Sequence, residues 1–143
     1  MPDIFHDLWI KSDPKNVYNA ICRQPGLDHW WTKSSEGTPE LGSEYKLFFG
    51  PEHDWRAEVT LCSPPDQFEW TMTSADQDWL GSRVGFLLSV DGPYTRVRFY
   101  HCGWPEDNNH FRRSSYCWAM YLRALKYFIE EGEIVPYEIR TSI

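Results

Sequence analysis

Several features that mark common classes of protein are missing from this sequence of 143 residues. No run approaches the roughly 18 apolar residues of a membrane-spanning helix, and the first residues lack the basic and apolar stretches of a signal peptide. Basic residues are few and scattered, 14 against 21 acidic ones, which leaves a net charge of −7. Phosphate binding needs a basic stripe. We therefore expect a cytoplasmic protein with no membrane span and no nucleic-acid partner.

Cysteine is also sparse. Cys22, Cys62, Cys102 and Cys117 lie far apart and form no C-x-x-C pair, so reduced thiols are expected. The cysteine and histidine spacings typical of zinc sites are missing, and the adjacent His101 and Cys102 would point to opposite faces of a strand. Glycine-rich phosphate loops and the serine-hydrolase elbow are missing too. We expect neither a metal nor a cofactor.

Aromatic side chains are what the sequence has in excess. Tryptophan, tyrosine and phenylalanine occur eight times each and make up 17% of the chain. The length suits one domain with one core, and no internal repeat or flexible linker divides it. Residues 1–143 are therefore expected to form a single domain.

Turn residues divide the first two thirds of the chain into short elements. Alternating polarity in residues 4–11 predicts a strand, and Asp13-Pro14 predicts the start of a short helix that Pro25-Gly26 ends, followed by one further helical turn. Residues 32–42 are polar and contain glycine and proline, so they are predicted to form a loop. Period-two alternation then predicts five strands, at residues 43–49, 55–62, 67–73, 80–90 and 95–102.

The last third of the chain changes to a helical period. Apolar residues between 109 and 131 recur at helical spacing, and Gly132 stands where a glycine commonly ends a helix. A single long helix must lay its apolar face on the sheet. We predict an α+β fold in which a curved six-stranded antiparallel sheet wraps a long C-terminal helix, with two short helices after the first strand. Trp118, Leu122, Leu125 and Ile129 should face the sheet, and Arg123, Lys126 and Glu130 should face water.

Six segments between residues 4 and 136 carry a resemblance to a known family. They are SDPKNVYNAI at 12–21, PGLDHWW at 25–31, DWLGSRVGF at 78–86, TRVRFYHCGW at 95–104, WAMYLRALK at 118–126 and EG at 131–132. In this order they resemble the helix-grip fold of the START/SRPBCC superfamily, which includes the birch-pollen allergen group and aromatic polyketide cyclases. The chain is most similar to the branch related to the activator of heat-shock protein 90 ATPase.

That resemblance implies a sheet that curls around the long helix and leaves a cavity between them. Some members of the superfamily bind lipids or other apolar ligands, some cyclise polyketides, and many have no known activity. No catalytic set of this branch matches the positions of this chain, so the resemblance implies no catalytic residues.

The resemblance, the inward strand parity and the aromatic excess together predict a ligand cavity between the helix and the concave face of the sheet. We expect it to be lined by Trp30, Trp31, Phe49, Trp70, Phe86, Phe99, His101, Trp118 and Tyr121. The same side chains could instead form a close-packed core. Of the two adjacent tryptophans, we expect one to pack in the interior and the other to cover the cavity mouth.

The titratable residues are weaker evidence for acid–base catalysis than the aromatic residues are for a binding cavity. The ordinary pKa of a histidine, about 6.5, would let a buried His101 or His6 carry a proton. A histidine that is hydrogen-bonded to the backbone at a strand end is the simpler interpretation. Asp76, Asp78 and Glu69 could do acid–base work, but they fall in turns or on the outward strand parity, where solvated surface is expected.

Three functions remain open from the sequence. The leading one is a non-catalytic START-like domain whose aromatic cavity binds a small apolar or aromatic ligand. The second is a protein-interaction module resembling a co-chaperone domain, which would need an apolar patch above the few hundred Å2 usual on a monomer. The third is a cyclase-type or hydrolase-type enzyme that uses His101, His6 or Tyr121 as acid–base groups. The sequence does not give the oligomeric state.

Overall fold

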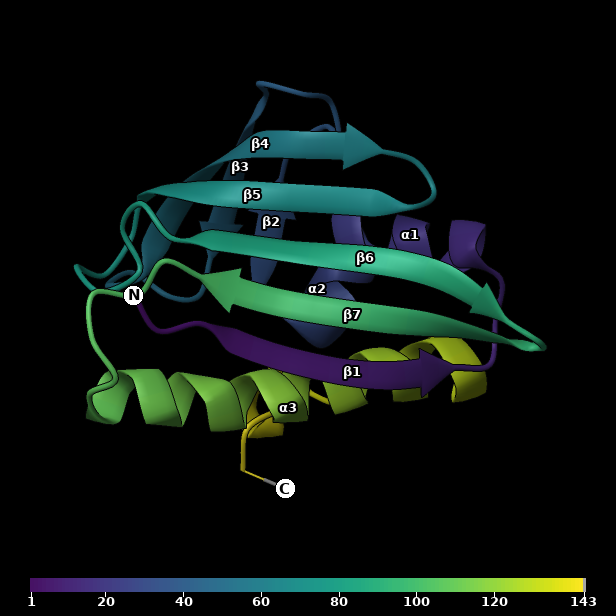
Figure 1. Ribbon diagram of the computed structural model, residues 1–143. Coiled ribbons are helices and arrows are strands. Elements are labelled where there is room, and N and C mark those ends of the chain that lie inside the picture. Colours follow the sequence, from purple (N-terminus) through teal and green to yellow (C-terminus); the bar gives the residue numbers. More distant parts are fainter. Residues whose placement is uncertain (143) are drawn as a thin grey trace.

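A seven-stranded antiparallel sheet curves around one long helix in the computed structural model, which describes residues 1–142 (Figure 1). The strand order is β1-β7-β6-β5-β4-β3-β2. The strands are β1 (Ile4–Ile10), β2 (Ser34–Glu36), β3 (Glu44–Phe48), β4 (Asp54–Ser63), β5 (Gln67–Ser74), β6 (Arg83–Asp91) and β7 (Tyr94–Cys102). The helices are α1 (Pro14–Cys22), α2 (Gly26–Trp30), α3 (Asn109–Glu131) and the single 3-10 turn η1 (Tyr137–Ile139).

The prediction of six strands was wrong by one, because β2 lies inside the segment predicted to be a loop. Its sequence, Ser-Ser-Glu, has no apolar alternation from which a strand could be predicted. Pairing with β3 holds it in place, with Ser35 opposite Leu47. The Ser35 hydroxyl also donates a 2.6 Å hydrogen bond to Asp28 of α2. Tertiary contacts, not local propensity, make this edge strand.

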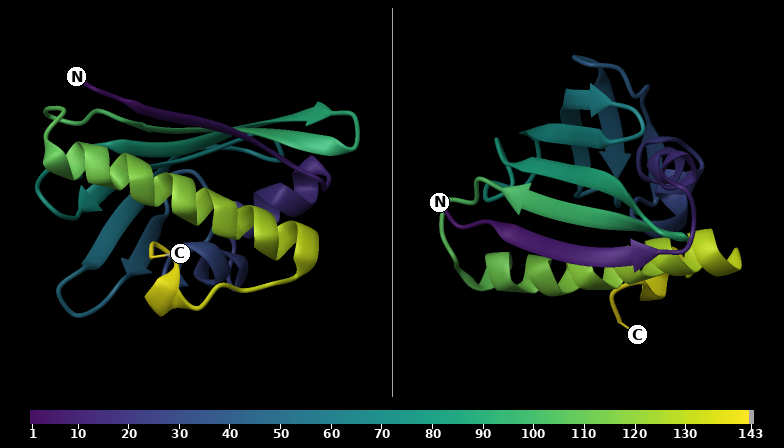
Figure 2. Two further views of the ribbon diagram at one scale, coloured as in Figure 1. Left: turned by 90° about the horizontal axis from the view of Figure 1, so that it is seen from below. Right: turned by 45° about the vertical axis from the view of Figure 1, so that its right-hand side comes forward.

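The first helix begins at Pro14 as predicted but ends at Cys22, before Pro25-Gly26, and the second begins at Gly26. The Asp13 side chain accepts the Asn16 amide at 2.7 Å, and Pro14 occupies the first turn of α1, where its missing N–H costs nothing. Both helices cover the sheet at the end far from the N-terminus of α3, as the two views in Figure 2 show.

Helix α3 has the predicted bounds, Asn109–Glu131, because both of its ends are capped. The Asn108 side chain accepts the Phe111 amide at 2.9 Å, and Gly132 ends the helix in the left-handed conformation at φ 70°. Within residues 1–142, no helix is both long and apolar enough to cross a membrane.

The predicted apolar face of α3 lies against the sheet. Trp118, Leu122 and Leu125 are buried, whereas Ile129 is only half-buried. Of the three side chains predicted to face water, Arg123 does so. Lys126 and Glu130 are half-buried because they bond to the backbone at the end of β1. Lys126 donates to the Trp9 carbonyl, and the Glu130 carboxylate accepts the Lys11 amide at 2.8 Å. These two bonds cover part of the free edge of β1, which protects that edge from pairing with another chain.

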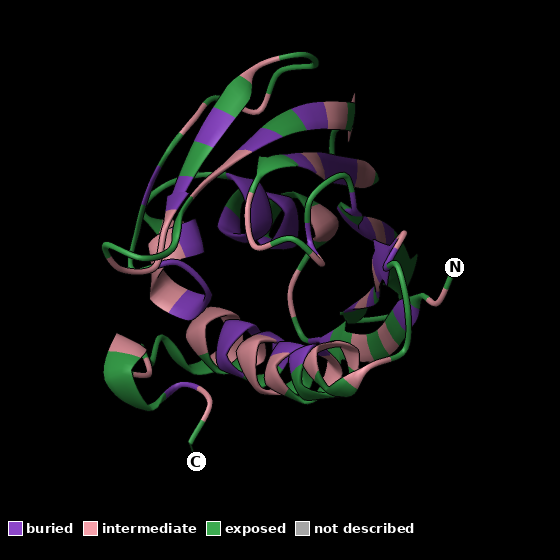
Figure 3. Cartoon of the chain, turned by 90° about the vertical axis from the view of Figure 1, so that its left-hand side faces the viewer, coloured by how far each residue is buried: buried purple, intermediate pink, exposed green. Residues whose placement is uncertain are grey.

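Buried and exposed residues alternate along several of the strands, as the purple and green bands in Figure 3 show. Twenty-eight buried apolar residues form one continuous cluster between the sheet and the helices. A single core for 143 residues is consistent with one domain.

Trp118 is the largest α3 side chain in this core, so its removal tests how the helix is held. We expect Trp118→Ala to lower the free energy of unfolding by about 3–5 kcal/mol, through lost burial and the cavity that it leaves. Urea unfolding followed by circular dichroism measures the change. Tyr116→Ala, which removes an exposed ring from the same helix, is the control and should have little effect. Equal effects of the two variants would contradict the assignment.

Candidate functional site

A cavity of about 290 Å3 lies between the N-terminal half of α3 and the adjacent loops of the sheet. The end of α2, the β3–β4 turn, the β5–β6 loop, α3 and η1 all contribute to its wall. The exposed residues His53 and Arg113 lie at the rim, so the cavity opens to solvent there. The lining residues are Trp31, Phe49, His53, Trp55, Asp76, Trp79, His110, Arg113, Ser114, Cys117, Trp118, Tyr121 and Tyr137.

Five of the lining rings contact one another in a closed circuit, which we call the aromatic wall: Trp31, Phe49, Trp55, Trp79 and Trp118. Starting from Trp31, the successive ring-centroid distances are 5.3, 5.1, 4.8, 5.8 and 5.1 Å. All of them fall in the range of attractive aromatic pairs. Four of the five pairs are tilted or edge-on, and such rings cannot fill space as aliphatic chains do. The five rings therefore attract one another and still leave a void beside them.

One face of α3 forms the floor of the cavity. His110, Arg113, Cys117 and Tyr121 are spaced by three and four residues, which places them on one side of the helix. Burial raises the pKa of the Tyr121 hydroxyl to about 12. It also raises the pKa of the Cys117 thiol, although the nearby positive charge of Arg113 opposes this shift. Both groups are therefore neutral at pH 7.

Two histidine–aspartate pairs hold the β5–β6 loop across the cavity mouth. His53 Nδ1 lies 3.5 Å from Asp76, and His110 Nδ1 lies 3.0 Å from Asp78. Hydrogen bonds from His110 and then Asn108 lower the pKa of Asp78. Because Trp79 follows these two aspartates, the pairs fix the position of a ring of the aromatic wall.

The C-terminal segment closes the opposite side. The Tyr137 hydroxyl donates to the Phe49 carbonyl at 2.9 Å, and Tyr137 lines the cavity. The buried Arg140 guanidinium donates to the Asp28 carbonyl at 2.7 Å and the Thr32 carbonyl at 3.1 Å. These carbonyls lie on either side of the two tryptophans at the end of α2. Arg140 thus fastens the C-terminal segment to the helix that positions Trp31.

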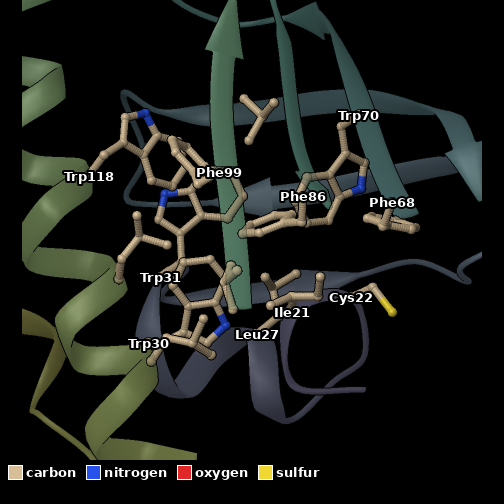
Figure 4. Packing of buried hydrophobic residues seen from close by; sticks show 14 of the residues in the cluster. Ile21, Cys22, Leu27, Trp30, Trp31, Phe68, Trp70, Phe86, Phe99 and Trp118 are labelled. Atoms are coloured by element: carbon tan, nitrogen blue, oxygen red, sulfur yellow. The ribbon is translucent and has the colours of Figure 1, made fainter. Parts of the chain in front are cut away.

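The structure brings four of the nine predicted lining residues to the cavity: Trp31, Phe49, Trp118 and Tyr121. The other five, Trp30, Trp70, Phe86, Phe99 and His101, lie in the packed core beside it. Figure 4 shows Phe86 between Phe99 and Trp70, and Trp31 next to Trp118. Ring centroids 5.3 to 6.5 Å from Phe86 fill the middle of the concave face, which leaves the void nearer the loops.

The two adjacent tryptophans have different roles, but neither covers a mouth. Trp30 is fully buried and its indole N–H donates to the Ala20 carbonyl at 2.9 Å, so it packs α2 against α1. Trp31 is 1% exposed and stands in the cavity wall. The expectation of a lid formed by one of them is therefore wrong.

Sequence reasoning missed lining residues from strand β4, from helix α3 and from the loops. Trp55 could have been found, because it shares inward strand parity with Ala57 and Val59. His110 and Arg113 could have been found from their helical spacing to Tyr121, which was predicted to line the cavity. Trp79 had no such signal, because it lies in a loop without periodicity.

His101 is a structural residue with a defined protonation state. The Trp118 indole N–H donates to Nδ1 at 3.1 Å, and the Ser82 hydroxyl donates to the Trp79 carbonyl at 2.5 Å. His101 Nε2, 2.7 Å from that hydroxyl, must therefore carry the proton and donate to it. Burial lowers the pKa of His101 to about 3. Its partners are side chains, not the backbone that the sequence interpretation favoured.

Of the remaining titratable candidates, Asp76 lines the cavity and is not simply solvated surface as expected, whereas His6 and Glu69 do not line it. His6 lies on the other side of α3, with Nε2 3.1 Å from the Ser115 carbonyl. Glu69 is on the outward face as predicted, but it is 4% exposed, not solvated. Its strand neighbour on β6 is Gly85, and the Tyr100 ring lies directly over that glycine, so the carboxylate is covered. Among residues 1–142, no three His, Cys, Asp or Glu side chains are grouped to hold a metal ion.

The proton on His101 gives a testable pH dependence. The unfolded chain binds a proton near pH 6.5, whereas the folded chain does so only near pH 3, so stability should fall as the pH falls below 6.5. Between these two pKa values, His101 should lower the free energy of unfolding by about 1.4 kcal/mol for each unit by which the pH falls. His101→Gln should flatten the slope between pH 6 and 4, measured by urea unfolding. Identical slopes for wild type and His101→Gln would contradict the assignment.

Comparison with known proteins identifies relatives of the chain. The family model described as Activator of Hsp90 ATPase homolog 1-like protein matches residues 11–130. No curated protein sequence matches the chain significantly. The solution structure of the Aha1 dimer from Colwellia psychrerythraea is 30% identical, with a TM-score of 0.85, over 93% of this chain and 99% of that one.

More distant structures share the fold. A crystal structure of a Staphylococcus saprophyticus protein has a TM-score of 0.80 at 15% identity, over 94% of this chain and 96% of that one. CalU16 from Micromonospora echinospora has a TM-score of 0.73 at 18% identity, over 91% of this chain and 77% of that one. With the family model matching most of its length, the chain belongs to the Activator of Hsp90 ATPase homolog 1-like family, within the SRPBCC superfamily.

Proposed function

We propose that the protein is a non-catalytic binding module that holds a small apolar or aromatic molecule in the cavity beside α3. The observation that carries the proposal is the aromatic wall, five rings that line one open void. Ligand pockets are mainly apolar and aromatic with a few placed polar groups, and this cavity has that composition. The void lies beside these rings and not inside the packed core, so a ligand in it would not have to unpack the core.

The cavity volume limits the size of the ligand. A cavity of about 150 Å3 accepts one benzene ring. The 290 Å3 measured here therefore corresponds to a molecule of about two fused rings. Larger members of the ligand class would have to extend past the rim at His53 and Arg113.

The arrangement of titratable groups favours binding over acid–base catalysis. An enzyme of the cyclase or hydrolase type would need two such groups converging on the ligand. His101 is occupied by Trp118 and Ser82, and His6 is separated from the cavity by α3. Of these three candidates only Tyr121 lines the cavity, and its raised pKa keeps it protonated at pH 7. The two histidines that line the cavity mouth are each paired with an aspartate, His53 with Asp76 and His110 with Asp78.

A cavity-filling substitution tests the proposal. Cys117→Phe places a ring inside the cavity and should abolish binding of 2-methylnaphthalene, measured by quenching of tryptophan fluorescence. Ala119→Phe adds the same ring to an exposed position of α3 outside this cavity, so it should bind as the wild type does. Native mass spectrometry of the purified wild type would also detect a co-purified ligand. The proposal fails if no small aromatic binds, or if both variants bind equally.

A protein-interaction module is the second candidate. It is favoured by one observation: the relative that is 30% identical has been solved as a dimer. Phe5 on the outer face of β1 is 69% exposed and offers an apolar contact for a partner. The same native mass spectra measure the oligomeric state. A dimer that Phe5→Ser dissociates would support this candidate, whereas a monomer at all concentrations would contradict it.

A further inference from the structure

The charged groups at the cavity rim point to a more specific ligand class. Arg113 lines the cavity and is exposed at its rim. Within residues 1–142, the ion pairs shorter than 4.0 Å do not include Arg113, so none of these carboxylates neutralises its guanidinium. Arg113 is therefore a positive charge at the rim that is free to meet an anionic group of a ligand.

The charge of Arg113 reaches into the cavity. It acts on the Cys117 thiol, one helical turn further along the same face. A guanidinium can only donate hydrogen bonds and is geometrically matched to the two oxygens of a carboxylate. A ligand group that satisfies it must therefore supply acceptor oxygens, and an anionic pair of them fits best.

A second unpartnered donor belongs to the aromatic wall. Trp79 is 6% exposed, and its buried indole N–H has no hydrogen-bond acceptor within residues 1–142. An indole nitrogen also has no capacity to accept. Two residues that line the cavity, Arg113 on α3 and Trp79 on the β5–β6 loop, thus both offer donors to an acceptor on a ligand.

One lining residue has the opposite charge. Asp76 would attract a cation, but it lies 3.5 Å from His53 and so already has a partner at the rim. His110 likewise directs its Nδ1 to Asp78. The acidic groups of the mouth are therefore engaged with imidazoles, whereas Arg113 is not.

From these contacts we propose that the cavity selects a planar aromatic carboxylate of about two fused rings, with its rings against the aromatic wall and its carboxylate on Arg113. This inference rests on the proposed binding function and adds the charge and shape of the ligand. Arg113 is then a specificity-determining residue, and the wall supplies the contact area.

Three naphthalene derivatives that differ only in charge test the inference. They are naphthalene-2-carboxylate, neutral 2-methylnaphthalene and cationic 2-(aminomethyl)naphthalene, titrated by calorimetry at pH 7 and low salt. The carboxylate should bind about tenfold more tightly than the cation, because a hydrogen bond to a charged group contributes about that factor. Tighter binding of the cation would overturn the inference and identify Asp76 as the stronger charge.

The chain supplies a matched pair of variants. Arg113→Gln should weaken binding of the carboxylate about tenfold more than it changes binding of 2-methylnaphthalene. Arg112→Gln removes the same charge from the neighbouring exposed position, which does not line the cavity, and should leave both unchanged. Arg113→Lys, which keeps the charge but not the planar fork, should retain part of the affinity.

The outcomes separate this inference from the proposed function. If 2-methylnaphthalene binds but the carboxylate binds no more tightly, the inference falls and the binding function stands. Equal effects of Arg113→Gln and Arg112→Gln would have the same meaning. If none of the three compounds binds, both the inference and the proposed function fall.

Discussion

The indole of Trp118 joins the parts of this protein on which the rest of the structure depends. Its ring lies 4.5 Å from Phe99 of the sheet and 5.1 Å from Trp31 of the α2 end, so it fixes α3 to both. Its N–H holds His101, which in turn holds Ser82 in the turn beside Trp79. One side chain therefore belongs at once to the core, to the buried hydrogen-bond chain and to the cavity wall.

The cavity exists because the side chains around it are large flat rings. Protein interiors are normally as dense as organic crystals, and a void loses dispersion contacts on its surface. Here the core rings around Phe86 pack closely, whereas the aromatic wall meets loops whose positions are set by polar bonds. The histidine–aspartate pairs and Arg140 hold those loops without filling the space between them. The void thus lies where hydrogen bonds, and not hydrophobic packing, determine the backbone.

The sequence predicts the elements that depend on interactions between neighbouring residues and misses those that depend on contacts between distant segments. Helix α3 was predictable to the residue, because its period and its caps at Asn108 and Gly132 are local. Strand β2 was not, because its three polar residues become a strand only by pairing with β3. The aromatic excess correctly indicated an aromatic-rich interior. Which rings face the void depends on loop positions, and Trp79 shows that such positions carry no periodic signal.

The hydrogen bonds of His101 explain why its burial is not evidence of catalysis in this protein. A catalytic histidine needs one ring nitrogen that can exchange a proton with a ligand. Both nitrogens of His101 are used, one accepting from Trp118 and the other donating to Ser82, and the chain ends at the backbone carbonyl of Trp79. A proton added to it would have no acceptor and would break the bond that positions Trp118. The histidine therefore specifies the geometry of the cavity wall, and its neutrality is the condition for that geometry.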